Sequence, residues 1–202
     1  MLRSHAPKEA SLEQVLAKQH SNHVLLHPSR PILLYDRGSE IVIEDLPSSG
    51  SKPQSLTLTL PFAGKITNIE SMSLTRDGCY LMVVTRTKDQ CFSNFEFHIV
   101  MFDLQLYKCK CNSVIPNVYQ SWENKNQNPT IRLQEYPPHL GKSHPGSTSI
   151  WTVINKNDKS GGFQLILWNF DSKFGELKIA DTRILNTDMG SYCDHFSIVS
   201  SQ

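Results

Sequence analysis

The chain has 202 residues, of which 39% are hydrophobic and 19% are charged, and its formal net charge is +1 at pH 7. A disordered chain has few apolar residues and a large net charge, so this composition predicts a folded protein of one or two domains. The near-neutral charge leaves no excess of cations to neutralise phosphates. No apolar stretch reaches the roughly 18 residues that cross a bilayer, so neither nucleic acid nor a membrane is expected as a partner.

Residues 1–22 are predicted to form an N-terminal tail with one short helix. Ser11 and Gln14 have the spacing of a capping box, and three apolar residues within 11–20 share one helical face: Leu12, Val15 and Leu16. A helix of about ten residues is marginal alone, so we expect it to dock on the rest of the protein. The segment lacks the apolar core of a signal peptide, which predicts a cytoplasmic or nuclear location.

From residue 23 the pattern changes to short apolar strands separated by turns. A first set, 23–61, contains four such strands, at 23–27, 32–36, 41–46 and 56–60. Proline, glycine and serine occupy the connections at 28–31 and 37–39. Adjacent strands joined this tightly pair in antiparallel fashion and form a meander.

A second set, 66–115, repeats this order. Asp77-Gly78 is a tight-turn dipeptide between two apolar segments, 71–75 and 80–85. The strand that follows carries apolar residues on one face (Phe95, Phe97, Ile99 and Met101) and on the other (Val100 and Phe102). A strand that is apolar on both faces is expected to be covered on both sides.

A third set, 130–185, follows a polar, proline-bearing segment at 116–148. Its predicted strands lie at 130–133, 150–154, 163–168 and 177–184. The remainder, 190–202, contains one more apolar stretch, 196–199, that could begin a further set.

Residues 26–33, followed by Ile41-Val42-Ile43-Glu44-Asp45-Leu46, resemble the inner strands of a WD40 repeat. In that family the third strand ends in a Trp-Asp pair or a substitute, and two later strands end similarly, at 100–104 and 167–170. The resemblance implies an all-β fold for 23–202, in which antiparallel four-stranded meanders are arranged as a β-propeller.

Three sets and a fragment are fewer than the four to eight blades with which propellers close. The resemblance therefore implies a partial propeller that needs further blades from the same or another chain. The alternative is a different antiparallel sandwich or barrel of about twelve strands.

No motif in the sequence predicts a catalytic, cofactor-binding or metal-binding residue. The sequence has neither a nucleophile elbow nor a dinucleotide fingerprint. Its histidines at 20, 23 and 27 and its cysteines at 109 and 111 lack the spacing of a zinc site.

The candidate partner-binding residues lie in and beside the polar segment: Tyr119, Trp122, Arg132 and Tyr136. Exposed aromatic and arginine side chains are the usual anchors of protein interfaces, and long loops are often functional. We therefore predict a non-enzymatic scaffold of WD40 type that binds protein partners. Two alternatives stay open: an enzyme with a site at strand ends or in a central channel, and a nucleic-acid-binding surface around 119–142.

Overall fold

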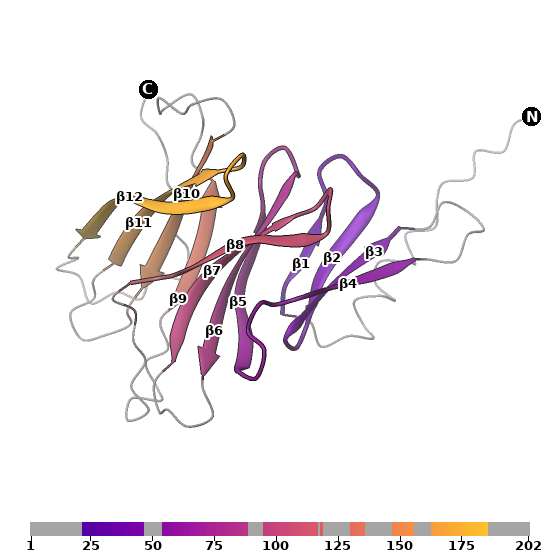
Figure 1. Cartoon of the computed structure of the whole chain (residues 1–202), viewed down its shortest axis with the longest axis horizontal. Coiled ribbons are helices and arrows are strands. Elements are labelled where there is room, and N and C mark those ends of the chain that lie inside the picture. The colour runs from indigo at the N-terminus through magenta and orange to yellow at the C-terminus, as the bar shows by residue number, and fades with distance from the viewer. Residues whose placement is uncertain are drawn as a thin grey trace, which may run out of the picture.

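A computed structural model describes residues 22–46, 54–88, 95–116, 118, 130–135, 147–155 and 163–185, and in these ranges the regular structure consists of strands alone (Figure 1). The all-β fold class is thus confirmed. The predicted N-terminal helix at 11–20 and the remainder at 190–202 lie outside the described residues.

Twelve described strands form three separate four-stranded antiparallel sheets. The first sheet contains β1 (Val24–Leu26), β2 (Ile32–Arg37), β3 (Glu40–Asp45) and β4 (Ser55–Thr59). The second contains β5 (Ile66–Leu74), β6 (Tyr80–Lys88), β7 (Glu96–Asp103) and β8 (Lys108–Val114). The third contains β9 (Thr130–Glu135), β10 (Ser147–Asn155), β11 (Phe163–Asp171) and β12 (Glu176–Leu185).

In each sheet the strands pair in chain order, as the meander prediction requires. The three predicted sets, 23–61, 66–115 and 130–185, coincide with the three sheets. Among the described strands no ladder joins one sheet to the next, so they do not form a single closed barrel.

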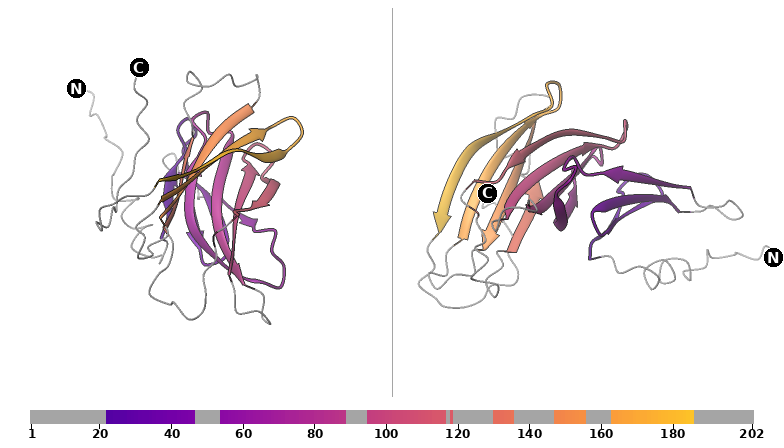
Figure 2. Two further views of the ribbon diagram at one scale, coloured as in Figure 1. Left: turned by 90° about the vertical axis from the view of Figure 1, so that its left-hand side faces the viewer. Right: turned by 60° about the horizontal axis from the view of Figure 1, so that its bottom comes forward.

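The second sheet lies between the other two, as the right-hand view of Figure 2 makes clear. Its strand β7 sends Val100 and Phe102 into a core shared with the first sheet, and Phe97, Ile99 and Met101 into a core shared with the third. The expectation that this strand is covered on both sides is confirmed. Because burial on both faces removes large apolar areas from water, the middle sheet makes the largest hydrophobic contribution to the stack.

The sheets approach one another through equivalent strands. The first strand of each sheet contacts its counterpart, β1 with β5 and β5 with β9, and the last strands β8 and β12 also touch. Neighbouring sheets are therefore stacked in parallel order, with the first strands along one side of the molecule.

His27 joins the first sheet to the second. Its Nδ1 accepts hydrogen bonds from the backbone amides of Ser29 and Arg30, at 3.2 and 3.0 Å. The ring proton is therefore assigned to Nε2, which donates to the carbonyl oxygen of Gly78 at 3.0 Å. Gly78 has φ of +71°, a backbone conformation that favours glycine.

Replacing Gly78 with alanine should be more destabilising than replacing Gly38, although both glycines have positive φ. A Cβ at Gly78 would lie 2.6 Å from Cε1 of His27, whereas a Cβ at Gly38 meets nothing within 4 Å. We expect Gly38→Ala to lower the free energy of unfolding by about 1–2 kcal/mol. Gly78→Ala should lower it by about a further 1–3 kcal/mol, measured by urea denaturation. Equal losses in the two variants would show that His27 does not pack tightly on this turn.

Candidate functional site

Two turns at one end of the sheets have the same geometry. In the β7–β8 turn, Oδ1 of Asp103 accepts hydrogen bonds from the amides of Gln105 and Leu106, at 2.8 and 3.0 Å. In the β11–β12 turn, Oδ1 of Asp171 accepts them from the amides of Lys173 and Phe174, at 2.9 and 3.1 Å. Each aspartate thus fixes the backbone of its own turn.

This equivalence corrects one detail of the sequence comparison. The likeness between 100–104 and 167–170 places Asn169 where Asp103 stands. In the structure β11 continues to Asp171, so that Phe170-Asp171 is the counterpart of Phe102-Asp103. A shift of two residues keeps every side chain on the same face of a strand, which is why alternation alone does not detect it.

The two turns present apolar side chains to solvent. Leu106 and Phe174 occupy equivalent positions and are 63% and 70% exposed. Tyr107, which follows Leu106, is 40% exposed. Exposed apolar side chains that gather at one end of a protein are typical of interaction surfaces.

Three cations accompany these apolar side chains. Nη1 of Arg30 lies 3.3 Å from the carbonyl oxygen of Leu104 and 3.4 Å from the hydroxyl of Tyr107, and donates to both. Lys173 places its Nζ over the ring of Phe174, 5.4 Å from the centroid. The stem of Lys110 packs on the β11–β12 turn, close to Gly175.

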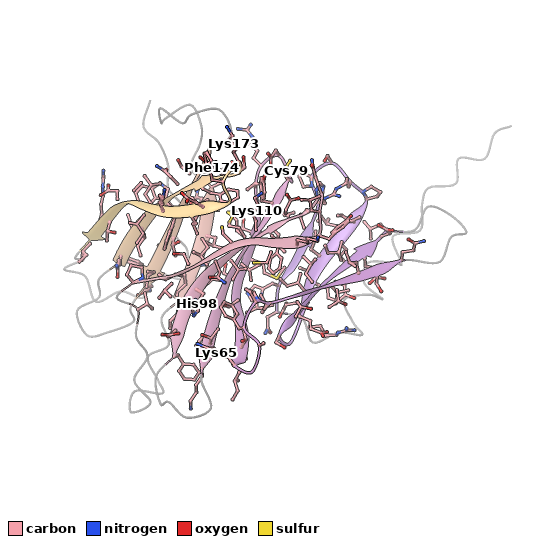
Figure 3. All side chains as sticks on the ribbon, viewed as in Figure 1. Lys65, Cys79, His98, Lys110, Lys173 and Phe174 are labelled. Atoms are coloured by element: carbon pink, nitrogen blue, oxygen red, sulfur yellow. The ribbon has the colours of Figure 1, made fainter. Side chains whose placement is uncertain are left out.

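We name this group of residues the turn-tip surface: Arg30, Leu106, Tyr107, Lys110, Lys173 and Phe174. Figure 3 places its labelled members, Lys110, Lys173 and Phe174, at the same end of the sheets as Cys79. The surface combines exposed apolar groups with three cations, and the carboxylates of Asp103 and Asp171, which accept turn amides, lie beside it.

The guanidinium of Arg30 lies against the ring of His27. Nε and Nη2 of Arg30 lie 3.1 and 3.0 Å from Nε2 of His27, but Nε2 carries the ring proton and cannot accept from them. Burial lowers the pKa of His27, the bond to Gly78 offsets this in part, and the charge of Arg30 lowers the pKa further. His27 is therefore held neutral against the guanidinium.

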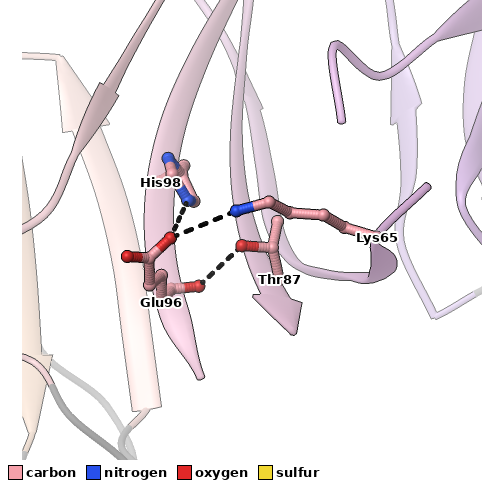
Figure 4. A network of polar contacts seen from close by, with 4 residues as sticks. All are labelled: Lys65, Thr87, Glu96 and His98. Atoms are coloured by element: carbon pink, nitrogen blue, oxygen red, sulfur yellow. Dashed lines mark hydrogen bonds and ion pairs between the residues drawn. The ribbon is translucent and has the colours of Figure 1, made fainter. Parts of the chain in front are cut away.

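A second polar group, drawn from close by in Figure 4, lies at the opposite end of the sheets, where Figure 3 labels Lys65 and His98. Oε2 of Glu96 is 3.4 Å from Nζ of Lys65 and 3.5 Å from Nε2 of His98, and the hydroxyl of Thr87 donates to the carbonyl oxygen of Glu96 at 3.5 Å. Burial lowers the pKa of His98; Glu96 opposes this shift and Lys65 adds to it.

The described cysteines lack the environment of a catalytic nucleophile. Burial raises the pKa of Cys109, and it raises that of Cys111 to about 11 with a further contribution from Cys109. Burial and then the hydrogen bond and charge of Asp77 raise the pKa of Cys79. Because the thiolate is the reactive form, these thiols are poor nucleophiles at neutral pH.

The structure places the sequence-predicted site residues only in part. Arg132 is an exposed residue of β9, and its side chain is not without a partner in the protein. Tyr119, Trp122 and Tyr136 lie outside the described residues, so the grouping of these four residues stays a prediction.

The sequence does contain a signal for the turn-tip surface that motif reasoning missed. Both turns have an aspartate three residues before an apolar residue, followed by a residue in the left-handed conformation: Asp103, Leu106 and Tyr107, and Asp171, Phe174 and Gly175. An apolar residue at the tip of such a turn cannot reach a core.

Two features are absent from the described residues. They contain no group of three or more His, Cys, Asp and Glu side chains that could hold a metal ion. Within the same ranges there is no helix with the length and apolar character needed to cross a membrane.

Comparisons with known proteins leave the chain without an assigned family. No protein-family model and no curated protein matches the sequence. Among solved structures, hydrazine synthase of Kuenenia stuttgartiensis is similar over 82% of this chain and 49% of its own, with 10% sequence identity and a TM-score of 0.35. The chain thus spans about half the length of that structure, and at this TM-score the likeness supports no inference about fold or function.

The lowered pKa values of His27 and His98 predict a loss of stability in mild acid. An unfolded histidine titrates near 6.5, so as the pH falls below 6.5 the unfolded state takes up protons that the folded state resists. The free energy of unfolding should fall by about 1.4 kcal/mol per pH unit for each such proton until the folded pKa is reached. Urea denaturation at pH 7.5, 6.5 and 5.5 measures this slope.

The double variant His27→Gln and His98→Gln provides the control, because glutamine does not titrate. The free energy of unfolding of this variant should fall less steeply between pH 7.5 and 5.5 than that of the unmodified protein. An identical slope would assign the acid sensitivity to other groups.

Proposed function

We propose that this chain is a non-enzymatic scaffold that binds protein partners through the turn-tip surface. The observation that carries the proposal is the pair of equivalent aspartate-anchored turns, which hold Leu106 and Phe174 in solvent. Rigid presentation favours binding, because little conformational freedom is lost when a partner docks.

The chemistry of the surface favours an acidic partner segment with at least one apolar residue. Arg30, Lys110 and Lys173 supply positive charge, and Tyr107 and Phe174 supply aromatic area, which is the composition of binding hot spots. Complementary charge would speed association and orient the partner, while the aromatic side chains would supply most of the affinity.

We further propose that the three sheets are blades of a partial, WD40-type propeller. The contacts between equivalent strands support this arrangement, since blades follow one another in parallel order around an axis. The far faces of the outer sheets also carry apolar residues, which form two small clusters that are buried or partly buried. On the first sheet these are Val24, Leu33, Tyr35, Val42 and Leu46, and on the third Trp151, Val153, Phe163, Leu165 and Leu167.

A sheet that ends a stack needs only one apolar face, whereas a blade with neighbours on both sides needs two. Further blades would come from the same or another chain, in the cytoplasm or the nucleus. The raised pKa values of the described thiols give the enzyme alternative less support.

The double variant Leu106→Ala and Phe174→Ala tests the binding function. Protein partners that bind the unmodified chain in an extract of its source cells should be lost, because truncating a hot-spot side chain costs about 2 kcal/mol or more, roughly thirtyfold in affinity. Stability should change little, since both side chains are exposed. Affinity capture with quantitative mass spectrometry is the measurement.

The matched control is Ile66→Ala with Ile184→Ala. Both isoleucines are exposed, and they lie at the ends of β5 and β12 that are opposite the turn tips. This control should retain every partner. Loss of the same partners in both double variants, or in neither, would argue against a role for the turn tips.

The partial-propeller proposal predicts self-association. An arc of three blades has open ends, and open sheet edges pair with other chains. Sedimentation velocity from about 1 to 100 μM, a range in which weak complexes with micromolar Kd form, should show a dimer that increases with concentration. A chain that stays monomeric over the whole range would contradict an open arc.

A further inference from the structure

The face of the second sheet that packs against the first changes from apolar to polar along its strands. One cross-strand row consists of Met72, Val83 and Val100, all in the core shared with the first sheet. The next row along the strands consists of Ile69, Thr85 and His98, and the one after that of Thr67, Thr87 and Glu96. Residues paired across strands share a face and lie within contact distance.

Most of this polar region is removed from solvent. Thr85 has no exposed surface, Thr87 is 1% exposed, and His98 and Thr67 are 7% and 8% exposed. The ring of Phe62, in the connection between the first and second sheets, lies 4.7 Å from the ring of His98. The charged groups of Lys65 and Glu96 stand where the buried region meets solvent.

Several buried polar atoms in these rows have no hydrogen-bond partner in the protein: Oγ1 of Thr67, Oγ1 of Thr85, and Nδ1 and Nε2 of His98. Nε2 of His98 lies 3.5 Å from Glu96, a contact that becomes an ion pair only when the ring is protonated. Thr87 differs from its neighbours because its hydroxyl donates to the carbonyl oxygen of Glu96.

A buried polar atom without a partner costs about 1–3 kcal/mol, and folded proteins avoid such atoms almost completely. Four of these atoms gather on one face of three adjacent strands, β5, β6 and β7. A buried water molecule makes about three hydrogen bonds, as donor and as acceptor, and so suits a group of hydroxyls and imidazole nitrogens.

We propose that Thr67, Thr85 and His98 form a binding site for ordered water between the first and second sheets. The water joins the hydroxyl of Thr85 to the ring of His98 and extends the buried polar network toward Glu96 and Lys65 at the surface. This proposal is independent of the binding function assigned to the turn tips, because it concerns the other end of the sheets.

Thr85→Val tests the site by the sign of a change in Tm, because valine has the shape of threonine without the hydroxyl. If water satisfies the hydroxyl, its removal leaves the water short of a partner, and Tm should fall by about 2–4 °C. If the hydroxyl is truly unsatisfied, its removal relieves a penalty and Tm should rise, which would overturn the proposal.

Thr59→Val on the exposed strand β4 is the matched control for the intrinsic effect of the substitution. A crystal structure of the full chain at about 1.5 Å gives a second readout that does not depend on the variant folding. It should contain a density peak within about 2.7–3.2 Å of Oγ1 of Thr85 and of one ring nitrogen of His98. A direct bond from the Thr85 hydroxyl to a protein carbonyl, with no peak between, would refute the site.

Discussion

The burial of both faces of the second sheet is the constraint on which the rest of the structure depends. Strands β6 and β7 alternate between the core shared with the first sheet and the core shared with the third, so one sheet belongs to two hydrophobic layers. Neither outer sheet contacts the other in these cores. A shift of one residue in β6 or β7 would turn side chains from one core toward the other. One core would then lose large side chains, and the other would receive side chains that it cannot pack.

The strand pattern was predictable because its cause is local. Apolar residues at alternate positions, separated by turn residues, determine which face of each strand is buried, and all three sheets follow from that rule. Chain order within each sheet follows from the short connections, which leave adjacent strands little choice of partner. The apolar residues on the two faces of β7, Ile99 and Met101 on one and Val100 and Phe102 on the other, predict burial on both sides.

The turn-tip surface could not be predicted from sequence motifs, for two physical reasons. The aromatic residues that the sequence favours, such as Trp122, lie outside the described part of the chain, whereas the turn tips carry ordinary leucine and phenylalanine. Exposure decides whether such a residue is a core residue or an anchor, and exposure depends on how the turn directs Leu106 and Phe174. The polar rows around His98 could not be predicted from the sequence, because Thr67, Thr85 and His98 come together only through strand pairing.

Position 107 shows how binding and folding can oppose each other within one residue. Tyr107 has φ of +53°, where its counterpart in the β11–β12 turn is a glycine with φ of +65°. A side chain in this conformation costs about 1–2 kcal/mol relative to glycine, so the tyrosine makes the turn less stable than it need be. In return its hydroxyl accepts a hydrogen bond from Arg30 and its ring stays in solvent. Selection for a more heat-resistant chain would favour glycine at this position, and the sequence would then lose the aromatic group together with the acceptor that anchors the arginine.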